Sequence, residues 1–139
     1  MKFSLAALAA MLIAWSSQVP ALAAAPRETI KTAFIEPIPN VPGKSLVGVV
    51  VNYPPGGATP AHHHERSAFI TGYVLSGSIR SQVNHGEVRV YHAGETWTEP
   101  PGADHEISEN ASATEPASLL AIFVVDSKET DKLTTFNGQ

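Results

Sequence analysis

The sequence predicts an all-β domain, built as an antiparallel β-barrel or jelly roll, and three observations predict it. Short apolar segments are separated by turn residues along most of the chain. Two of these segments alternate apolar and polar side chains with a period of two, which is typical of half-buried strands. No window beyond residue 25 carries a helical stripe. Short strands without helices form sandwiches or barrels, and 139 residues suit one such domain.

The expected strands follow one another between clear turn signals. The first is rich in valine and ends at Pro54-Pro55-Gly56-Gly57, a strong turn sequence. The segments 79–83 and 88–92 carry the two-residue period, and His85-Gly86 between them is an expected two-residue hairpin turn. In order along the chain, we expect strands at residues 45–53, 69–75, 79–83, 88–92, 96–99, 105–110 and 119–125.

Two segments flank the expected barrel, which spans residues 45–127. Residues 26–44 contain four prolines, a density that prevents a helix and disfavours a central strand. This segment is therefore an extended lead-in or an edge element. Residues 128–139 form a polar tail whose only apolar anchors are Leu133 and Phe136. We expect the tail to pack against the barrel, to pair with another subunit or to stay loose.

The first 25 residues have the pattern of a cleavable signal peptide. Lys2 supplies a positive start, residues 3–15 are apolar apart from Ser4, and Ala21-Leu22-Ala23 matches the small-x-small cleavage pattern. The apolar run is shorter than the roughly 20 residues that cross a bilayer. We expect a periplasmic or secreted protein that has no membrane contact after cleavage. A buried N-terminal helix is the alternative.

Charge and cysteine content narrow the classes of partner. The chain has 13 acidic and nine basic residues, and without Lys2 the balance is eight against 13, a formal charge of −5. Such a balance argues against nucleic acid and anionic membrane as partners. There are no cysteines, so neither a disulfide nor a lipid-attached cysteine is available. The fold must hold by its apolar core.

Histidines are the residues that point most directly to chemistry. Three of the six are consecutive, His62, His63 and His64. In an extended segment alternate side chains share a face, so His62 and His64 would point the same way and His63 the opposite way. Two imidazoles on one face can bind one metal ion, although a solvated histidine-rich loop is the alternative. His105 follows the turn sequence 100–104 and would supply a third ligand from another strand.

The spacing of these histidines resembles that of the cupin family. In this family the chain would be a small, single-domain, exported cupin of type 2. The first cupin motif runs from Gly through five residues to His-x-His, and here Gly56 is followed after five residues by His62 and His64. The second runs from Gly through Pro-x-Gly to His and Asn. The matching positions are Gly94, Pro100, Gly102 and His105, with Asn110 one residue late. The resemblance covers residues 56–110 and implies a double-stranded β-helix, or jelly roll, with a metal inside the barrel mouth.

One position departs from the cupin pattern. The motif glutamate should lie at Ala68 or Phe69, or at Ile70 when counted back from Gly77, and none of these is a carboxylate. Two acids could compensate. Glu65 follows His64 directly and faces away if the strand continues. Glu99 shares strand parity with Trp97, so it points into the barrel if Trp97 faces the core. There it could act as a metal ligand or as a catalytic acid or base. The alternative is that Glu99 is a charged residue on the outer rim of the barrel.

Three neutral imidazoles leave coordination positions open for water or substrate. Imidazole suits several divalent ions, so Fe, Zn, Mn, Ni and Cu all stay open as the one bound metal. The first hypothesis is a metal-dependent enzyme acting on a small organic molecule, dioxygenase-like or isomerase-like, in which Glu99 moves a proton. The alternative is a non-catalytic periplasmic barrel that binds a small ligand or metal. Cupins commonly dimerise through edge strands, so the resemblance also implies a homodimer.

The remaining aromatic and polar residues support packing more than chemistry. Tyr73, Trp97 and Phe123 are expected in the core, and His92 beside them as a hydrogen-bonded core histidine. His85 is expected in solvent. Arg80 and Gln82 share a face, which we expect to lie on the outside of the barrel, although an inward face could bind an anionic substrate.

Overall fold

The computed structural model describes residues 27–136, and the predicted signal peptide, residues 1–25, lies outside that range. The described chain consists of strands and one short 3-10 helix, η1 (Ser127–Glu129). No helix in this range is long and apolar enough to span a membrane. The strands are β1 (Thr29–Pro37), β2 (Lys44–Tyr53), β3 (Ala58–Thr59), β4 (His62–His64), β5 (Phe69–Ser76), β6 (Ser78–Val83), β7 (Arg89–His92), β8 (Thr96–Glu99), β9 (Asp104–Asn110), β10 (Ala117–Asp126) and β11 (Thr134–Phe136).

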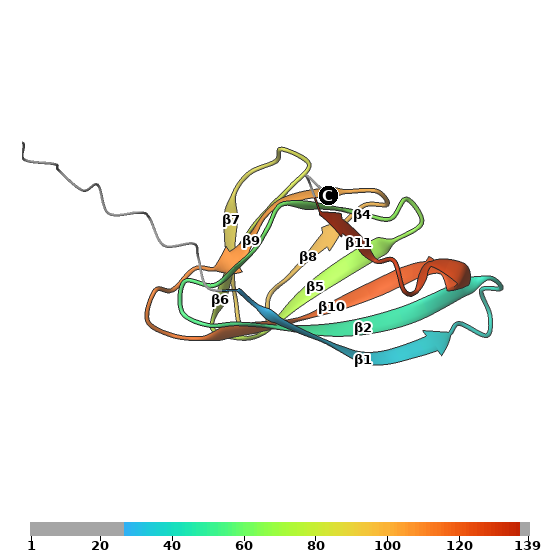
Figure 1. Ribbon diagram of the computed structural model, residues 1–139, viewed down its shortest axis with the longest axis horizontal. Coiled ribbons are helices and arrows are strands. Elements are labelled where there is room, and N and C mark those ends of the chain that lie inside the picture. The colour runs from blue at the N-terminus through green and yellow to red at the C-terminus, as the bar shows by residue number, and fades with distance from the viewer. Residues whose placement is uncertain (1–26, 137–139) are drawn as a thin grey trace, which may run out of the picture.

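These strands form two antiparallel sheets that face each other (Figure 1). One sheet has the order β1-β2-β10-β5-β8, and the other has the order β11-β4-β9-β6-β7 with β3 also paired to β9. Strands that are neighbours in space are mostly distant in sequence, as in a jelly roll. The predicted all-β jelly-roll fold is therefore confirmed.

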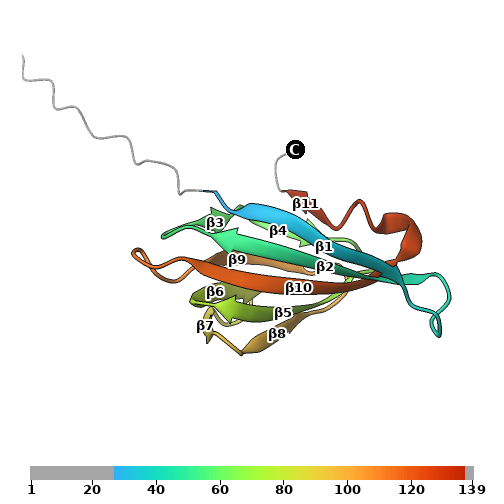
Figure 2. The same cartoon turned by 90° about the horizontal axis from the view of Figure 1, so that it is seen from below.

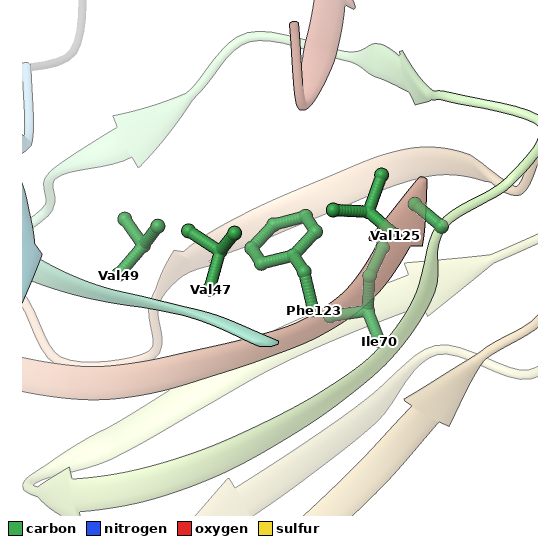
Figure 3. Packing of buried hydrophobic residues seen from close by; sticks show 6 residues of the cluster. Val47, Val49, Ile70, Phe123 and Val125 are labelled. Carbon is green, nitrogen blue, oxygen red and sulfur yellow. The ribbon is translucent and has the colours of Figure 1, made fainter. Parts of the chain in front are cut away.

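The interior is filled by side chains from both sheets in two clusters. The first contains Val47, Val49, Ile70, Phe123 and Val125, which lie together in Figure 3, with Ala68 beside them. The second contains Tyr53, Val74, Ile79, Trp97, Ala117 and Leu119. Alternation along each strand supplies these inward residues. The core predictions for Trp97 and Phe123 are correct.

Three local predictions are wrong. Tyr73 is exposed because it has the opposite parity to the buried Val74. His92 is also exposed, because Tyr91 is the β7 residue that packs on the second cluster. The turn after β6 is centred one residue earlier than expected, on Asn84 and His85, both with positive φ. It is followed by an unpaired stretch before β7, so the hairpin is longer than two residues.

The flanking segments both join the sheets. The lead-in forms β1 at the edge of one sheet, where it pairs with β2. The polar tail forms β11, which pairs with β4 at the edge of the other sheet, and Leu133 just before it packs on the first core cluster. Packing against the barrel is thus the outcome among the three that the sequence left open. Both edge strands lie next to the histidine-bearing part of the fold.

Candidate metal centre

The histidine triplet forms the short strand β4, and its side chains alternate as a strand requires. His62 and His64 are buried and face the interior, while His63 is exposed and contacts the Asp104 carboxylate outside the sheet. The parity prediction for the three residues is correct.

His105 joins the pair from the neighbouring strand β9, where it lies directly opposite His62. The ring centroids are 5.1 Å apart for His62 and His105, 4.8 Å for His62 and His64, and 6.0 Å for His64 and His105. One nitrogen from each ring lies within 4.8 Å of the others, so the three residues form a group that can hold a metal ion. The tight turn before β9 delivers His105 to this position.

Carbonyl groups set the orientation of two of the rings. The Nδ1 of His62 donates to the Pro60 carbonyl at 2.8 Å, and the Nδ1 of His64 donates to the Leu133 carbonyl at 3.1 Å. Because a carbonyl can only accept, these contacts assign the proton of the neutral ring to Nδ1 and leave Nε2 for a ligand. Outer partners of this kind are what metal-binding histidines usually have. His105 is oriented by the Ser81 hydroxyl, 2.9 Å from its Nε2.

Glu99 lies among these histidines with only 2% of its surface exposed. Its Oε2 is 3.0 Å from the Nε2 of His64, and its Oε1 is 3.3 Å from the Nδ1 of His105. The Trp97 indole donates to Oε1 at 3.0 Å and fixes the carboxylate. The expectation that Glu99 points into the barrel with Trp97 is met, and the outer-rim alternative is excluded. Glu65, in contrast, is not one of the residues lining the interior cavity.

The register explains how Glu99 reaches this place. It is paired across the sheet with Ile70, one of the positions where the cupin motif has its glutamate. Residues directly opposite on adjacent antiparallel strands point to the same face with Cβ atoms about 4.5–5.5 Å apart. The carboxylate missing from β5 is therefore supplied one strand away, from β8.

The polar atoms of this group fit a cation. His64 Nε2 and Glu99 Oε2 are both buried, and neither makes a well-formed hydrogen bond. With His64 Nδ1 committed to a carbonyl, its Nε2 and the carboxylate are two acceptors 3.0 Å apart. Two such acceptors need a proton or a metal ion between them. A set of imidazoles and one carboxylate suits Zn, Fe, Mn, Ni or Cu.

Burial also sets the charge of the group. It lowers the pKa of His62 to about 4 and lowers that of His105, so both rings are neutral at neutral pH. Burial by itself raises the pKa of Glu99. The hydrogen-bonding contact with His64, together with the electrostatic interaction with the two histidine side chains and the Trp97 hydrogen bond, outweighs that effect and holds the Glu99 pKa below its ordinary value. Neutral imidazoles beside an ionised carboxylate are the protonation states that bind a metal.

A cavity of about 220 Å³ opens beside the four residues. Its walls are mainly apolar and come from both sheets, with Val49, Ile70, Leu119 and Phe123 among them. Ile30 of β1 and Leu133 before β11 also line it, and Ile30 is largely exposed, so the mouth lies between these two edge strands. An apolar pocket with a few convergent polar groups is the usual form of a small-molecule site.

The comparisons with known proteins agree with this geometry. The family model described as "Cupin domain" matches residues 49–123, which is 75 of the 139 residues and includes all four residues of the group. This chain belongs to the cupin family. No curated protein matches it.

Solved structures show the same cupin fold. The cupin domain of Schizosaccharomyces pombe Cnp3 is 19% identical with a TM-score of 0.59, over 76% of this chain and 69% of that one. An oxalate oxidase is 25% identical with a TM-score of 0.59, over 79% of this chain and 55% of that one. The DMSP lyase DddQ from Ruegeria pomeroyi DSS-3 is 20% identical with a TM-score of 0.54, over 66% and 43%. This cupin thus spans about half the length of the two enzymes.

The other histidines of this cupin lie outside the cavity. His85 is exposed, and its Nδ1 is 2.8 Å from Glu106, whose carboxylate also accepts from the His85 backbone N–H at 2.9 Å. Asp104 completes an exposed to half-buried group with these two, on the outer face of the sheet. Arg80 is also outside, paired with Glu109 at 2.6 Å. The predicted solvent positions of His85 and Arg80 are correct.

Sequence reasoning missed one part of the site. The carbonyl of Leu133 orients His64, and the ring of Phe136 lies 5.7 Å from that of His62. The available signal was that Leu133 and Phe136 are the only apolar residues of the tail. Nothing local in the sequence says that this tail pairs with β4.

Gly72 provides the space for the indole that holds Glu99. A Cβ at Gly72 would lie 2.5 Å from Cζ2 of Trp97. Gly72→Ala must therefore displace the buried indole, and we expect a loss of about 1–3 kcal/mol in the free energy of unfolding, measured by urea denaturation. The same substitution in a Trp97→Phe background should cost much less, because the smaller phenyl ring lacks the outer ring of the indole, whose Cζ2 and Cη2 atoms the new Cβ would meet. Equal costs in the two backgrounds would contradict this account.

Proposed function

We propose that this cupin is a metal-dependent enzyme acting on a small organic molecule, with His62, His64 and His105 as metal ligands. The observation that carries the proposal is the buried convergence of three imidazole nitrogens and a carboxylate on one cavity. A divalent ion held there would polarise an oxygen of a bound substrate. The chemistry is dioxygenase-like if the ion is redox-active and isomerase-like if it is not.

The side chains would have separate tasks. The carbonyls of Pro60 and Leu133 keep the Nε2 atoms of His62 and His64 turned inward. Glu99, fixed at Oε1 by the Trp97 indole, would accept a proton from the substrate at Oε2, beside the Nε2 of His64, and return it later. The apolar walls exclude water from this exchange.

The lining of the cavity favours one class of substrate. No lysine or arginine is among the described residues that line it, and the only carboxylate is Glu99. A dianionic substrate would find no positively charged side chain in the cavity, and the ion alone would compensate its charge. The volume of about 220 Å³ is below the roughly 300–1,000 Å³ typical of drug-sized ligands. We propose a compact, largely apolar substrate with one oxygen donor for the ion, such as a phenol or enol.

A non-catalytic ligand- or metal-binding barrel is the alternative. The absence of the motif glutamate is a reason for this alternative, because a site with one negatively charged ligand fewer binds a metal less tightly. Glu99 supplies a carboxylate to the same face, so that reason is weaker. Residues 1–25 support export, and we propose that the enzyme acts in the periplasm or outside the cell.

Elemental analysis of protein purified without a histidine tag or chelator tests the proposal. We expect about one divalent ion per chain, as in other three-histidine sites. Iron, manganese or copper would be followed by an oxygen-uptake screen with phenols and thiols, and zinc or nickel by an isomerisation screen. Protein that takes up no metal even after reconstitution would contradict the metal centre. A stoichiometric metal without turnover in either screen would favour the binding barrel.

A further inference from the structure

Three hydroxyl groups that the proposed mechanism does not use meet in the wall of the cavity. The Tyr53 hydroxyl lies 2.8 Å from the Oγ1 of Thr59 and 2.8 Å from the Oγ of Ser108, and all three residues line the cavity. Tyr53 reaches from β2 in one sheet to β3 and β9 in the other, and Figure 2 shows β3 beside the end of β2. Tyr53 is only 2% exposed and Ser108 5%, so a polar cluster is buried in a mainly apolar wall.

A bulge in β9 turns Ser108 towards the cavity. Strict alternation from the inward His105 would place Ile107 inside and Ser108 outside. The register between β9 and β6 shifts at this point, which leaves Glu106 without a partner and places Ser108 opposite the buried Ser81. Bulges re-aim side chains in this way and are common next to active sites. The bulge thus puts a hydroxyl group, and not an isoleucine, into the cavity.

Thr59 reaches the cavity through a similar break in alternation. It lies three residues before His62, as Ser108 lies three residues after His105, and two residues outside any strand separate β3 from β4. Both Thr59 and His62 therefore line the cavity. At about 3.3 Å per residue, the hydroxyl-bearing residues lie roughly 10 Å along the strands from the histidines. The cavity thus has polar groups at two separate places.

The three hydroxyl groups cannot fully satisfy one another. Each carries one proton and can also accept. Their two mutual contacts use two of the three protons, so one O–H stays available to a bound molecule, as do several lone pairs. Burial, and to a smaller extent the charge of Glu28, raises the pKa of Tyr53, which therefore keeps its proton at neutral pH. Glu28 itself makes no hydrogen bond with the three groups. A buried donor of this kind is costly to leave without an acceptor.

We infer that the hydroxyl groups of Tyr53, Thr59 and Ser108 form a second subsite, which binds a hydroxyl or carbonyl oxygen of the substrate. The inference rests on the proposed function for the nature of the substrate. It narrows the class from a phenol or enol to a molecule that carries a second oxygen at its far end. A six-membered ring with oxygen-bearing groups at opposite positions has about the reach required, and the apolar walls suit the ring itself.

Isothermal titration calorimetry of the full chain with two probes tests the inference. The probes are para-hydroxymethylphenol and para-ethylphenol, which have nearly the same shape and differ in one hydroxyl group. We expect the hydroxymethyl probe to bind at least about tenfold more tightly, because its oxygen accepts the available proton. Without the subsite, the ethyl probe would bind more tightly to the apolar walls. Equal affinities, a preference for the ethyl probe, or no binding of either probe at millimolar concentration would overturn the inference.

A double variant locates the preference. With Tyr53→Phe and Ser108→Ala combined, the preference for the hydroxymethyl probe should disappear. The matched control combines Tyr91→Phe and Ser76→Ala, which remove the same groups at positions that do not line the cavity, and it should keep the preference. Circular dichroism checks that the variants fold, and if the cavity variant does not, the wild-type comparison decides. A preference that survives in the folded cavity variant would overturn the inference.

The same titrations with zinc-loaded and metal-free protein separate this inference from the proposed function. Zinc has no redox chemistry, so neither probe is oxidised. It should tighten the binding of both probes by the same factor, because both carry the phenol oxygen. If zinc has no effect and the hydroxymethyl preference remains, the metal centre is wrong and the subsite stands. If zinc tightens both and there is no preference, the subsite is wrong and the metal centre stands.

Discussion

His105→Ala will remove the metal from this cupin while the barrel stays folded. His105 supplies one of the three nitrogens that lie within 4.8 Å of each other. Loss of a ligand should weaken metal affinity by more than the roughly 10–100-fold that follows from loss of an outer partner. The fold should survive, because His105 contacts the site and Ser81 and is in neither apolar core cluster. Metal content by elemental analysis and circular dichroism of the same sample check the two halves.

The control for this variant is His63→Ala. His63 is the neighbour of two proposed ligands in sequence, but it is exposed and contacts Asp104 on the other side of the sheet. It should keep its full complement of metal. Full metal retention in His105→Ala, or equal loss in His63→Ala, would contradict the three-histidine centre.

Glu99→Gln will reduce turnover far more than it reduces metal content. Glutamine has the shape of glutamate and can still accept from the Trp97 indole, so the side chain should stay in place. It cannot take up a proton, and loss of a positioned acid or base costs about 10²–10⁴-fold in rate. The measurement is kcat with the substrate found in the screens, together with metal per chain.

Glu95→Gln is the matched control, because Glu95 is exposed and binds the backbone N–H of His92 away from the cavity. Its rate should equal that of the unmodified enzyme. If Glu99→Gln instead loses metal and activity in equal proportion, Glu99 is a fourth ligand. Its distances of 3.0 Å from His64 and 3.3 Å from His105 would then be those of neighbouring ligands.

The sequence by itself determined the features that depend on local alternation. The turn signals placed β2 and the strands from β5 to β10 to within about two residues, whereas the short strands β3 and β4 were not among the expected strands. A period of two put His62 and His64 on one face and His63 on the other, and it tied Glu99 to Trp97. At Tyr73 no clear alternation marked the inward parity, and the prediction was wrong. Segment 88–92 does alternate, but its sequence did not show which face is buried: Tyr91 packs on the core, and Val90 and His92 are exposed.

Only the tertiary structure decided which strands became neighbours. It paired Glu99 with Ile70, so that a carboxylate from β8 takes the place left empty on β5. It also placed the tail on β4, where the Leu133 carbonyl orients His64, and a bulge in β9 turned Ser108 into the cavity. The physical reason is that parity follows from the geometry of each strand, whereas pairing between distant strands follows from the packing of the whole core.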